Sequence, residues 1–336
     1  MWFWSRERDL FAAIRACAVA RVKNHIDRGA NVNSRERRGV TPLYLSAHVP
    51  SGEVSDQIVL SLLAAGADPN VYAYGGTTPL MVASAHEHYA IVEALLAGGA
   101  AIDAATRAPS RTGMTALGCA ADFGHTRIVE LLLQHGAHIE AKHENGATPV
   151  CWAAGKGHID AVELLLAKGA KVDVVGEYNL TPLAIAVQDG HTNVVRALLK
   201  YGAPADGPRL AGGATPLMHA AGEGATEIVK LLIESGAEVN AVANMGFTAL
   251  MGSAWKNRID CAKLLLEKGA NVNAKGELGV MIPMEAIREP SPEHDAAARK
   301  IIEAGHENVN TSLKVARALG HTQIAELLIH FGANEG

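Results

Sequence analysis

Small and apolar positions recur along the chain with a nearly constant period. Thr115, Thr148 and Thr181 are 33 residues apart, Thr215 follows after 34 and Thr248 after 33. Each begins a segment of the same pattern: a Thr-Pro-Leu type start, two small residues, a Gly-His pair, a Val-x-Leu-Leu-Leu stripe and a Gly-Ala-x-Val-Asn end. Self-similarity at such a period is typical of stacked supersecondary units, none of which can bury its apolar face alone. The pattern therefore predicts a repeat solenoid.

Each part of the period predicts a local structure. Threonine followed by proline favours a helix start, because the threonine side chain can cap free N–H groups and proline at the first helical position loses no hydrogen bond. The Gly157-His158 pair breaks the chain, and residues 161–166 then carry apolar side chains at helical spacing, which indicates a second, antiparallel helix. Gly169 suits a left-handed helix end, and the segment beyond it is expected to project as a hairpin towards the next unit.

Three segments carry a family resemblance: "GMTALGCAADFGHTRIVELLLQHGAHIEA" (113–141), "GATPVCWAAGKGHIDAVELLLAKGAKVDV" (146–174) and "GATPLMHAAGEGATEIVKLLIESGAEVNA" (213–241). The chain resembles the ankyrin repeat family, which implies an all-α repeat solenoid of helix-turn-helix units with projecting β-hairpin loops, about nine to ten units including caps. The expected organisation is a single solenoid over 1–336, with an N-terminal cap repeat (9–40), seven ankyrin repeats (41–280), a degenerate repeat with an insertion (281–310) and a C-terminal capping repeat (311–336).

The chain departs from the family pattern at one framework position. Family units usually carry histidine directly after Thr-Pro-Leu, where it links the threonine to the loop. Here that position holds Tyr44, Met81, Gly118, Cys151, Ala184, Met218 and Met251. Extra residues also occur in "HVPSGEVSD", "TRAPS" and "REPSPEHD", which are either binding loops or tolerated insertions.

Reactive-looking residues in the repeats are explained by recurrence. Cys151 and Trp152 occupy positions that hold apolar residues elsewhere, and His158 has histidine counterparts in four other units, so we assign them to the core and to the inter-helix turn. His86 and His88 are the best metal suspects, but residues two apart on a helix point to different faces. Neither a phosphate-binding loop nor a nucleophile elbow occurs, so we expect no enzyme activity, no cofactor and no metal.

Composition limits the classes of partner. The chain has 336 residues, a net charge of -5 and 30 basic residues dispersed among 35 acidic ones, which argues against nucleic acid. No apolar run is long enough for a membrane span, the N-terminus does not look like a signal peptide, and the four cysteines form no Cys-x-x-Cys pair. These features predict a soluble, cytoplasmic protein. A monomer is expected, with self-association through the aromatic N-terminus or the irregular C-terminal units left open.

The resemblance implies where a protein partner would bind. Ankyrin repeat proteins usually hold ligands on the hairpin tips and the solvent-facing residues of the first helices, which line a concave groove. The candidates on these positions are Arg35, Arg37, Arg38, Tyr72, Tyr74, Arg111, Met114, Phe123, Tyr178, Met245, Phe247, Trp255 and Lys256. Tyr, Trp and Arg dominate interface hot spots. The three arginines of the first tip suit an acidic partner segment, and a solvated charged tip explains them equally well.

Two functional hypotheses follow from this surface. The first is a non-catalytic scaffold or adaptor that binds a protein partner on the groove. The second is a stoichiometric inhibitor or immunity-type protein that neutralises a toxin or enzyme. The same groove would serve both, so the sequence does not separate them.

Overall fold

A computed structural model describes residues 3–50, 52–107, 112–276 and 311–334. In these residues the regular secondary structure is helical, with no β-strand, and the α-helices come in antiparallel pairs. The chain divides into two compact units, Met1–Lys171 and Val172–Gly336.

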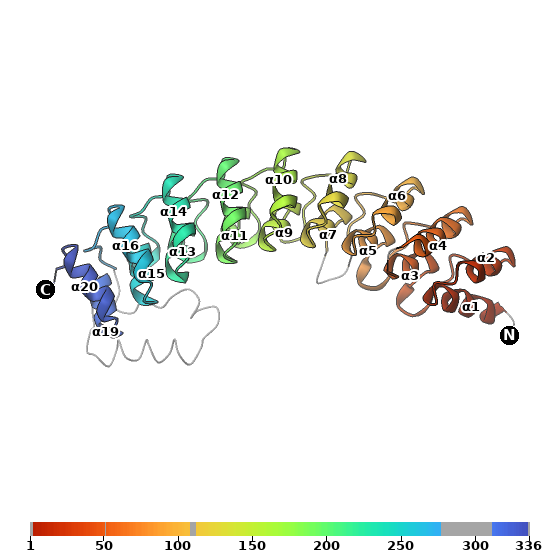
Figure 1. Cartoon of the computed structure of the whole chain (residues 1–336), viewed down its shortest axis with the longest axis horizontal. Helices are drawn as coiled ribbons and strands as arrows, with labels where there is room; N and C mark the ends of the chain where they lie inside the picture. Colours follow the sequence, from red (N-terminus) through yellow and green to blue (C-terminus); the bar gives the residue numbers. More distant parts are fainter. Residues whose placement is uncertain (1–2, 51, 108–111, 277–310, 335–336) are drawn as a thin grey trace. The chain divides into compact units, whose positions relative to one another are not determined.

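The first unit contains five helix pairs. The pairs are α1 (Phe3–Arg15) with α2 (Val19–Asp27), α3 (Pro42–His48) with α4 (Glu53–Ala64), α5 (Pro79–Ala85) with α6 (Tyr89–Ala97), α7 (Ala116–Asp122) with α8 (Thr126–Gln134), and α9 (Pro149–Gly155) with α10 (Ile159–Ala167). Each first helix packs against the first helix of the next pair, and each second helix against the next second helix, so two parallel rows form (Figure 1).

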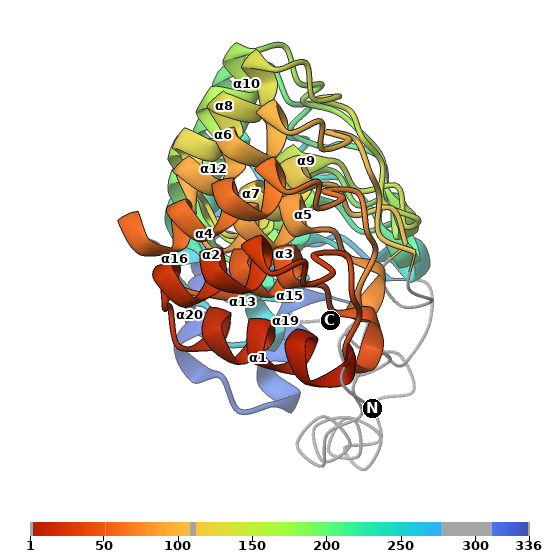
Figure 2. The same cartoon turned by 90° about the vertical axis from the view of Figure 1, so that its right-hand side faces the viewer.

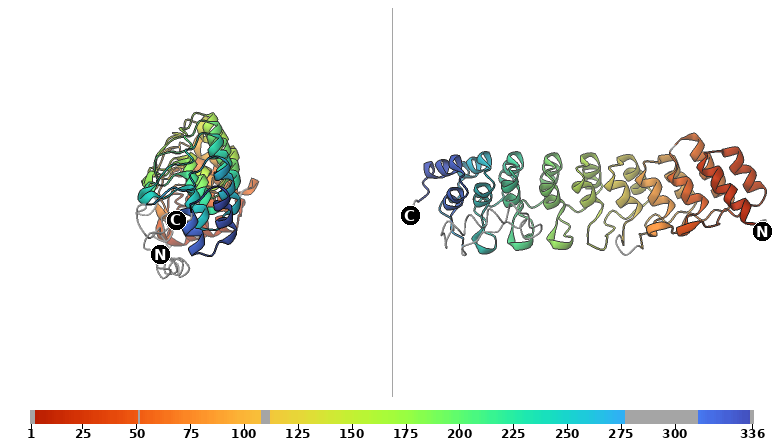
Figure 3. Two further views of the ribbon diagram at one scale, coloured as in Figure 1. Left: turned by 90° about the vertical axis from the view of Figure 1, so that its left-hand side faces the viewer. Right: turned by 90° about the horizontal axis from the view of Figure 1, so that it is seen from below.

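The second unit repeats this arrangement. Its pairs are α11 (Pro182–Gln188) with α12 (Thr192–Lys200), α13 (Pro216–Glu223) with α14 (Thr226–Glu234), α15 (Ala249–Trp255) with α16 (Ile259–Glu267), and α19 (Ser312–Ala318) with α20 (Thr322–His330). The α19 helix packs directly on α15, and α20 on α16 (Figure 3). The predicted degenerate repeat at 281–310 lies outside the described residues, and the single-solenoid organisation stays a prediction.

Threonine side chains begin most of the first helices, as the sequence predicts. The hydroxyl oxygens accept a hydrogen bond from the backbone N–H three residues later, at Thr41, Thr78, Thr115, Thr181, Thr215, Thr248 and Thr311. Thr148 differs, because its hydroxyl lies 3.6 Å from the Cys151 sulfur instead. Each cap satisfies one of the free N–H groups of a helix start and contributes about 1 kcal/mol.

Aliphatic and alanine side chains make the core between the two helix rows. Leu95, Leu132 and Leu165 of the second helices are fully buried, as are Ala120 and Ala153 of the first helices. Alanine has almost no side chain beyond the backbone, so first helices of consecutive repeats can approach closely. Because every repeat buries its apolar stripe against its neighbours, stability comes from stacking.

Histidines at the inter-helix turns join consecutive repeats. A ring nitrogen of His88 lies 3.0 Å from Ala47 O, and one of His158 lies 3.1 Å from Asp122 O. His125 and His321 make equivalent contacts with carbonyl oxygens near the end of the preceding first helix. A carbonyl oxygen can only accept, so the ring nitrogen donates. The structural role predicted for these histidines is confirmed at the four positions.

Asparagine side chains join the loops that follow the second helices. Asn70 donates from Nδ2 to Gly99 O at 3.1 Å and accepts from the Ala101 N–H at 2.7 Å. Asn273 makes the same pair of bonds with Gly332 O and the Asn334 N–H. The repeat that contains α19 and α20 is therefore connected to the α15–α16 repeat by both helix packing and loop hydrogen bonds.

The predicted hairpins are tight loops, each closed by a backbone hydrogen bond between its two arms. In each loop a backbone N–H of the first arm donates to a carbonyl oxygen of the second arm. The donor and acceptor pairs are Glu36 and Val40, Ala73 and Thr77, Thr106 and Met114, His143 and Ala147, Gly176 and Leu180, Leu210 and Ala214, and Ala243 and Phe247. The loops lie along the same side of the helices in the first unit, away from the second helices (Figure 2).

Candidate protein-binding surface

Several loop tips contain two consecutive residues in the left-handed conformation. Glycine supplies both in the tips Gly75-Gly76 and Gly212-Gly213. In two other tips the first of these positions is not glycine: Arg38 has a φ of 65° and Tyr178 a φ of 57°. A left-handed conformation costs a residue other than glycine about 1–2 kcal/mol. Arg38 is exposed, and Tyr178 is 70% exposed.

Consecutive tips of the first unit contact one another. The Arg107 guanidinium lies 4.0 Å from the centroid of the Tyr72 ring, which comes from the preceding loop. A Cβ placed on Gly39 would lie 3.5 Å from Tyr72 O, and the Glu144 N–H donates to Thr112 O at 3.0 Å. The loops 34–40, 71–77, 104–107, 112–114 and 141–147 therefore form a continuous surface, which we name the tip strip.

Charge is segregated in the first unit. The tip strip carries five basic residues and two acidic ones, Glu36 and Glu144, and Glu36 is ion-paired with Arg15. The second helices α4, α6, α8 and α10 carry six acidic residues and one basic one, Arg127, whereas α2 carries Arg21 and Lys23 against Asp27. The loop side of this unit is therefore basic, and the second-helix side is acidic from α4 to α10.

The predicted binding residues of the first unit differ in accessibility. Arg35, Arg37 and Arg38 are exposed on one loop, and Tyr72 is half-buried under Arg107. Arg111 and the side chain of Tyr74 lie outside the described residues.

Met114 and Phe123 lie at opposite ends of α7. Met114 is half-buried, and its sulfur would lie 2.7 Å from a Cβ on Gly118. The absence of a side chain at Gly118 therefore makes room for Met114. Phe123 is 55% exposed, and its ring stacks at 6.0 Å on that of His125. Phe123 therefore exposes an apolar ring face to solvent, whereas Met114 exposes only part of its side chain.

Two predicted residues of the second unit belong to the core. Trp255 is 6% exposed and packs with Met251 and Val315, and the half-buried Phe247 packs against the same cluster. The expectation that Trp255 presents its ring to a partner is wrong, because α19 covers it.

The other predicted residues of the second unit lie at the surface or outside the described part. Tyr178 is the most exposed large side chain among the described apolar and aromatic residues. Lys256 is half-buried, and its Nζ lies 2.7 Å from the Glu223 carboxylate. The side chain of Met245 lies outside the described residues.

The comparisons with known proteins agree with this architecture. The family described as ankyrin repeats, in three copies, matches residues 10–106, 49–143, 103–176, 139–207, 174–243 and 204–276. The chain belongs to the ankyrin repeat family. The crystal structure of the human ASB11 ankyrin repeat domain is similar, with a TM-score of 0.60 and 27% sequence identity, over 68% of this chain and 98% of that one. No curated protein matches the chain.

Ankyrin repeats are generally protein–protein interaction modules. Sequence reasoning missed Arg107, although it noticed the insertion "TRAPS" that contains it. It also missed Val175 and Val242, which are 46% and 55% exposed in the loops of the second unit. Val175 lies between Val174 and Gly176, and Val242 lies between two alanines, so the local sequence does not single them out as exposed.

The stretch around Cys151 is part of the ankyrin framework. Cys151 is 3% exposed, and burial raises the pKa of its thiol. Because the thiolate is the nucleophilic form, a raised pKa leaves this thiol unreactive. Trp152 is half-buried, with its ring edge-on to that of His143 at 5.4 Å. The core assignment of Cys151 is confirmed.

Three histidines gather where α3 and α5 end. The ring centroids of His48 and His86 are 5.0 Å apart, and those of His86 and His88 are 5.7 Å apart. Burial lowers the pKa of His48 and of His88, and the neighbouring histidines lower both further. No group of side chains among the described residues has the arrangement of a metal site.

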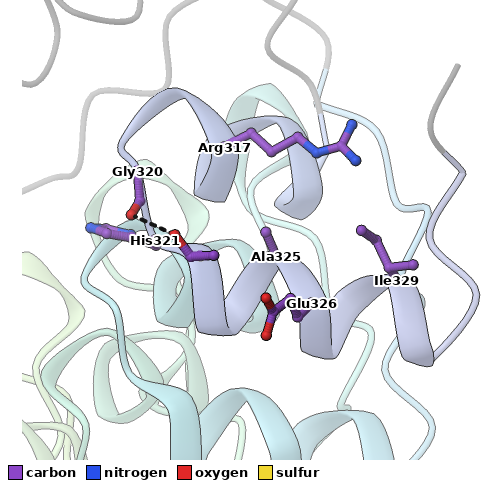
Figure 4. A pocket seen from close by; sticks show the side chains of 7 residues that line it. Arg317, Gly320, His321, Ala325, Glu326 and Ile329 are labelled. Atoms are coloured by element: carbon purple, nitrogen blue, oxygen red, sulfur yellow. Dashed lines mark hydrogen bonds between the residues drawn. The ribbon is translucent and has the colours of Figure 1, made fainter.

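A hollow on the α19–α20 helix pair is lined by Arg317, Gly320, His321, Thr322, Ala325, Glu326 and Ile329 (Figure 4). The Thr322 hydroxyl donates to Gly320 O, and His321 contacts Ala254 O, so these polar groups serve the fold. Among the described residues, no helix is both long and apolar enough to cross a membrane.

Proposed function

We propose that this ankyrin repeat protein is a non-catalytic scaffold that binds a protein partner through its loop tips and the ends of its first helices. A repeat array offers an extended surface whose variable residues can change without disturbing the framework. Here the framework residues, such as the capping threonines and turn histidines, are engaged in helix and repeat contacts. The tip residues Arg38 and Tyr178 are exposed to solvent.

The conformation of Arg38 and Tyr178 carries the proposal. Both occupy left-handed tip positions where other repeats have glycine, and both are exposed. Residues held in such conformations lower stability, and they cluster at ligand-binding and switch regions. Tyrosine and arginine are also the residue types that are enriched at interface hot spots. Contact with a partner explains why an arginine and a tyrosine stand exposed at these two left-handed positions.

The test separates binding from folding. The unmodified protein and the double variant Arg38→Gly/Tyr178→Gly are used for affinity capture from the cell lysate, and bound proteins are identified by mass spectrometry. The variant should fail to capture the partner that the unmodified protein captures. Glycine relieves the left-handed strain, so the midpoint of urea unfolding should stay the same or rise by the equivalent of about 1–2 kcal/mol per site.

The matched control replaces the same residue types away from the loop tips and the first helices. Arg28 and Tyr201 are exposed and follow the second helices α2 and α12. Arg28→Gly/Tyr201→Gly should capture the same partner as the unmodified protein. Equal capture by the tip variant and this control would refute the placement of the binding surface.

The four cysteines support a cytoplasmic location for this scaffold. All four are free thiols, as expected of a protein in a reducing compartment such as the cytoplasm.

A further inference from the structure

We propose that the tip strip of the first unit binds an acidic peptide segment of the partner, laid across the loops 34–40, 71–77 and 104–107. This inference rests on the proposed function and adds the chemistry of the partner. Its first support is charge, because the strip is basic while the second helices α4, α6, α8 and α10 of the same unit are acidic. An approaching acidic segment is therefore attracted to the strip and repelled by the side formed by these four helices.

The arginines are presented in a way that suits carboxylates. Arg35 and Arg37 are exposed, and neither takes part in a salt bridge among the described residues. The intervening acidic residue, Glu36, is neutralised by Arg15. An arginine fork can bind a carboxylate through two parallel hydrogen bonds, so these side chains favour Asp and Glu as partners.

Arg107 extends the basic surface to the third loop. Its guanidinium lies 4.0 Å from the Tyr72 ring centroid, so a cation–π interaction with the ring face stabilises the charged group. Stacking restricts the long side chain before any ligand arrives, which reduces the entropy lost on binding. Because Tyr72 belongs to the preceding loop, the contact also connects loop 71–77 with loop 104–107.

A single-stranded nucleic acid fits this surface less well. Proteins that bind single strands without sequence preference stack bases on exposed aromatic faces along a basic groove. Tyr72 is half-buried, and Arg107 occupies one face of its ring. The strip therefore favours a peptide.

The experiment measures binding directly with defined probes. A fluorescein-labelled peptide of alternating Glu and Ser is titrated with the full-length protein and followed by fluorescence anisotropy. A Gln–Ser peptide of the same length and a labelled oligo-dT are the comparison probes. We expect saturable binding of the acidic peptide, weaker binding of the other two, and loss of binding as salt rises towards 1 M, where the Debye length is about 3 Å.

The binding variant reverses three charges of the strip: Arg35→Glu/Arg37→Glu/Arg107→Glu. An exposed ion pair changes an equilibrium constant by a factor of about 1.4–5, and reversal replaces attraction with repulsion, so we expect at least about tenfold weaker binding. The neutral variant Arg35→Gln/Arg37→Gln/Arg107→Gln should give an intermediate loss. The neutral variant keeps the test valid if the reversed one unfolds.

The control variant makes the same change in net charge away from the strip. It reverses exposed lysines on the second helices of the other unit: Lys200→Glu/Lys230→Glu/Lys263→Glu. Binding of the acidic peptide should fall by less than half in this variant. An equal loss in the control and strip variants would overturn the proposal, because net charge would then explain the binding.

The remaining outcomes also decide the matter. No binding of the acidic peptide, or tighter binding of the oligo-dT, would overturn the acidic-peptide proposal. The scaffold proposal would still stand if the Arg38 and Tyr178 variant lost its captured partner. Failure of both assays would count against both proposals.

Discussion

A single methyl group at Gly124 should destabilise the repeat that contains α7 and α8 through two separable effects. Gly124 has a φ of 74°, and a Cβ placed on it would lie 2.5 Å from Nδ1 of His158. Atoms this close cannot both stay in place, so the His158 ring must move and its 3.1 Å contact with Asp122 O is lost.

The magnitude follows from these two effects. The left-handed conformation costs alanine about 1–2 kcal/mol, and loss of the inter-repeat hydrogen bond costs about 0.5–1.5 kcal/mol. We therefore expect Gly124→Ala to lower the free energy of unfolding by about 1.5–3.5 kcal/mol. Gly136 is the matched control, because its φ is 87° and no heavy atom lies within 4 Å of its Cβ position. Gly136→Ala should lower the free energy of unfolding only by the cost of the left-handed conformation, about 1–2 kcal/mol.

Urea unfolding followed by tryptophan fluorescence measures both variants. Trp152 of α9 lies in the adjoining repeat and is a suitable reporter. In a His158→Ala background the steric conflict is absent, so Gly124→Ala should then cost no more than Gly136→Ala. The reasoning is refuted if the two glycine variants are equally stable in the unmodified protein. It is also refuted if their difference persists without the histidine ring.

Three further predictions concern the core, pH and the last repeat. Trp255→Ala should lower the free energy of unfolding by about 3–5 kcal/mol in urea titrations, because the side chain is 6% exposed; a loss below about 1 kcal/mol contradicts its core role. Burial lowers the pKa of His88 in the folded state, so the unfolded state binds more protons and stability should fall as pH drops below about 6.5. His88→Gln should flatten that pH dependence, and an unchanged slope speaks against it. Asn273→Ala removes both side-chain bonds to residues 332 and 334, so amide hydrogen exchange in 311–334 should accelerate; unchanged protection would show that helix packing alone holds this repeat.

The fold could be predicted because the residues that specify each helix and turn recur in every repeat of the sequence. Thr115 and Thr215 cap helices for the same reason, and the small residues after them are buried in each copy. One exception is Thr148, which faces a cysteine sulfur instead of an N–H group.

The candidate surface was less predictable. Phe123 directly follows α7 and is 55% exposed, whereas Trp255 is the last residue of α15 and is 6% exposed. Val315 of α19 packs against Trp255 across a long stretch of intervening sequence, so the sequence around Trp255 does not reveal its burial. Arg107 likewise acquires its role from Tyr72, which belongs to the preceding loop.

The sequence by itself determined the period, the helix pairs, the caps and the set of variable positions, because these depend on residues close together in the chain. Tertiary structure alone decided which variable side chains remain accessible and which charges share a surface. Accessibility depends on what the next repeat covers, and charge segregation depends on which loops meet in space. Arg38 and Tyr178 show both contributions: their positions follow from the repeat, whereas their left-handed backbone and exposure follow from the folded loops.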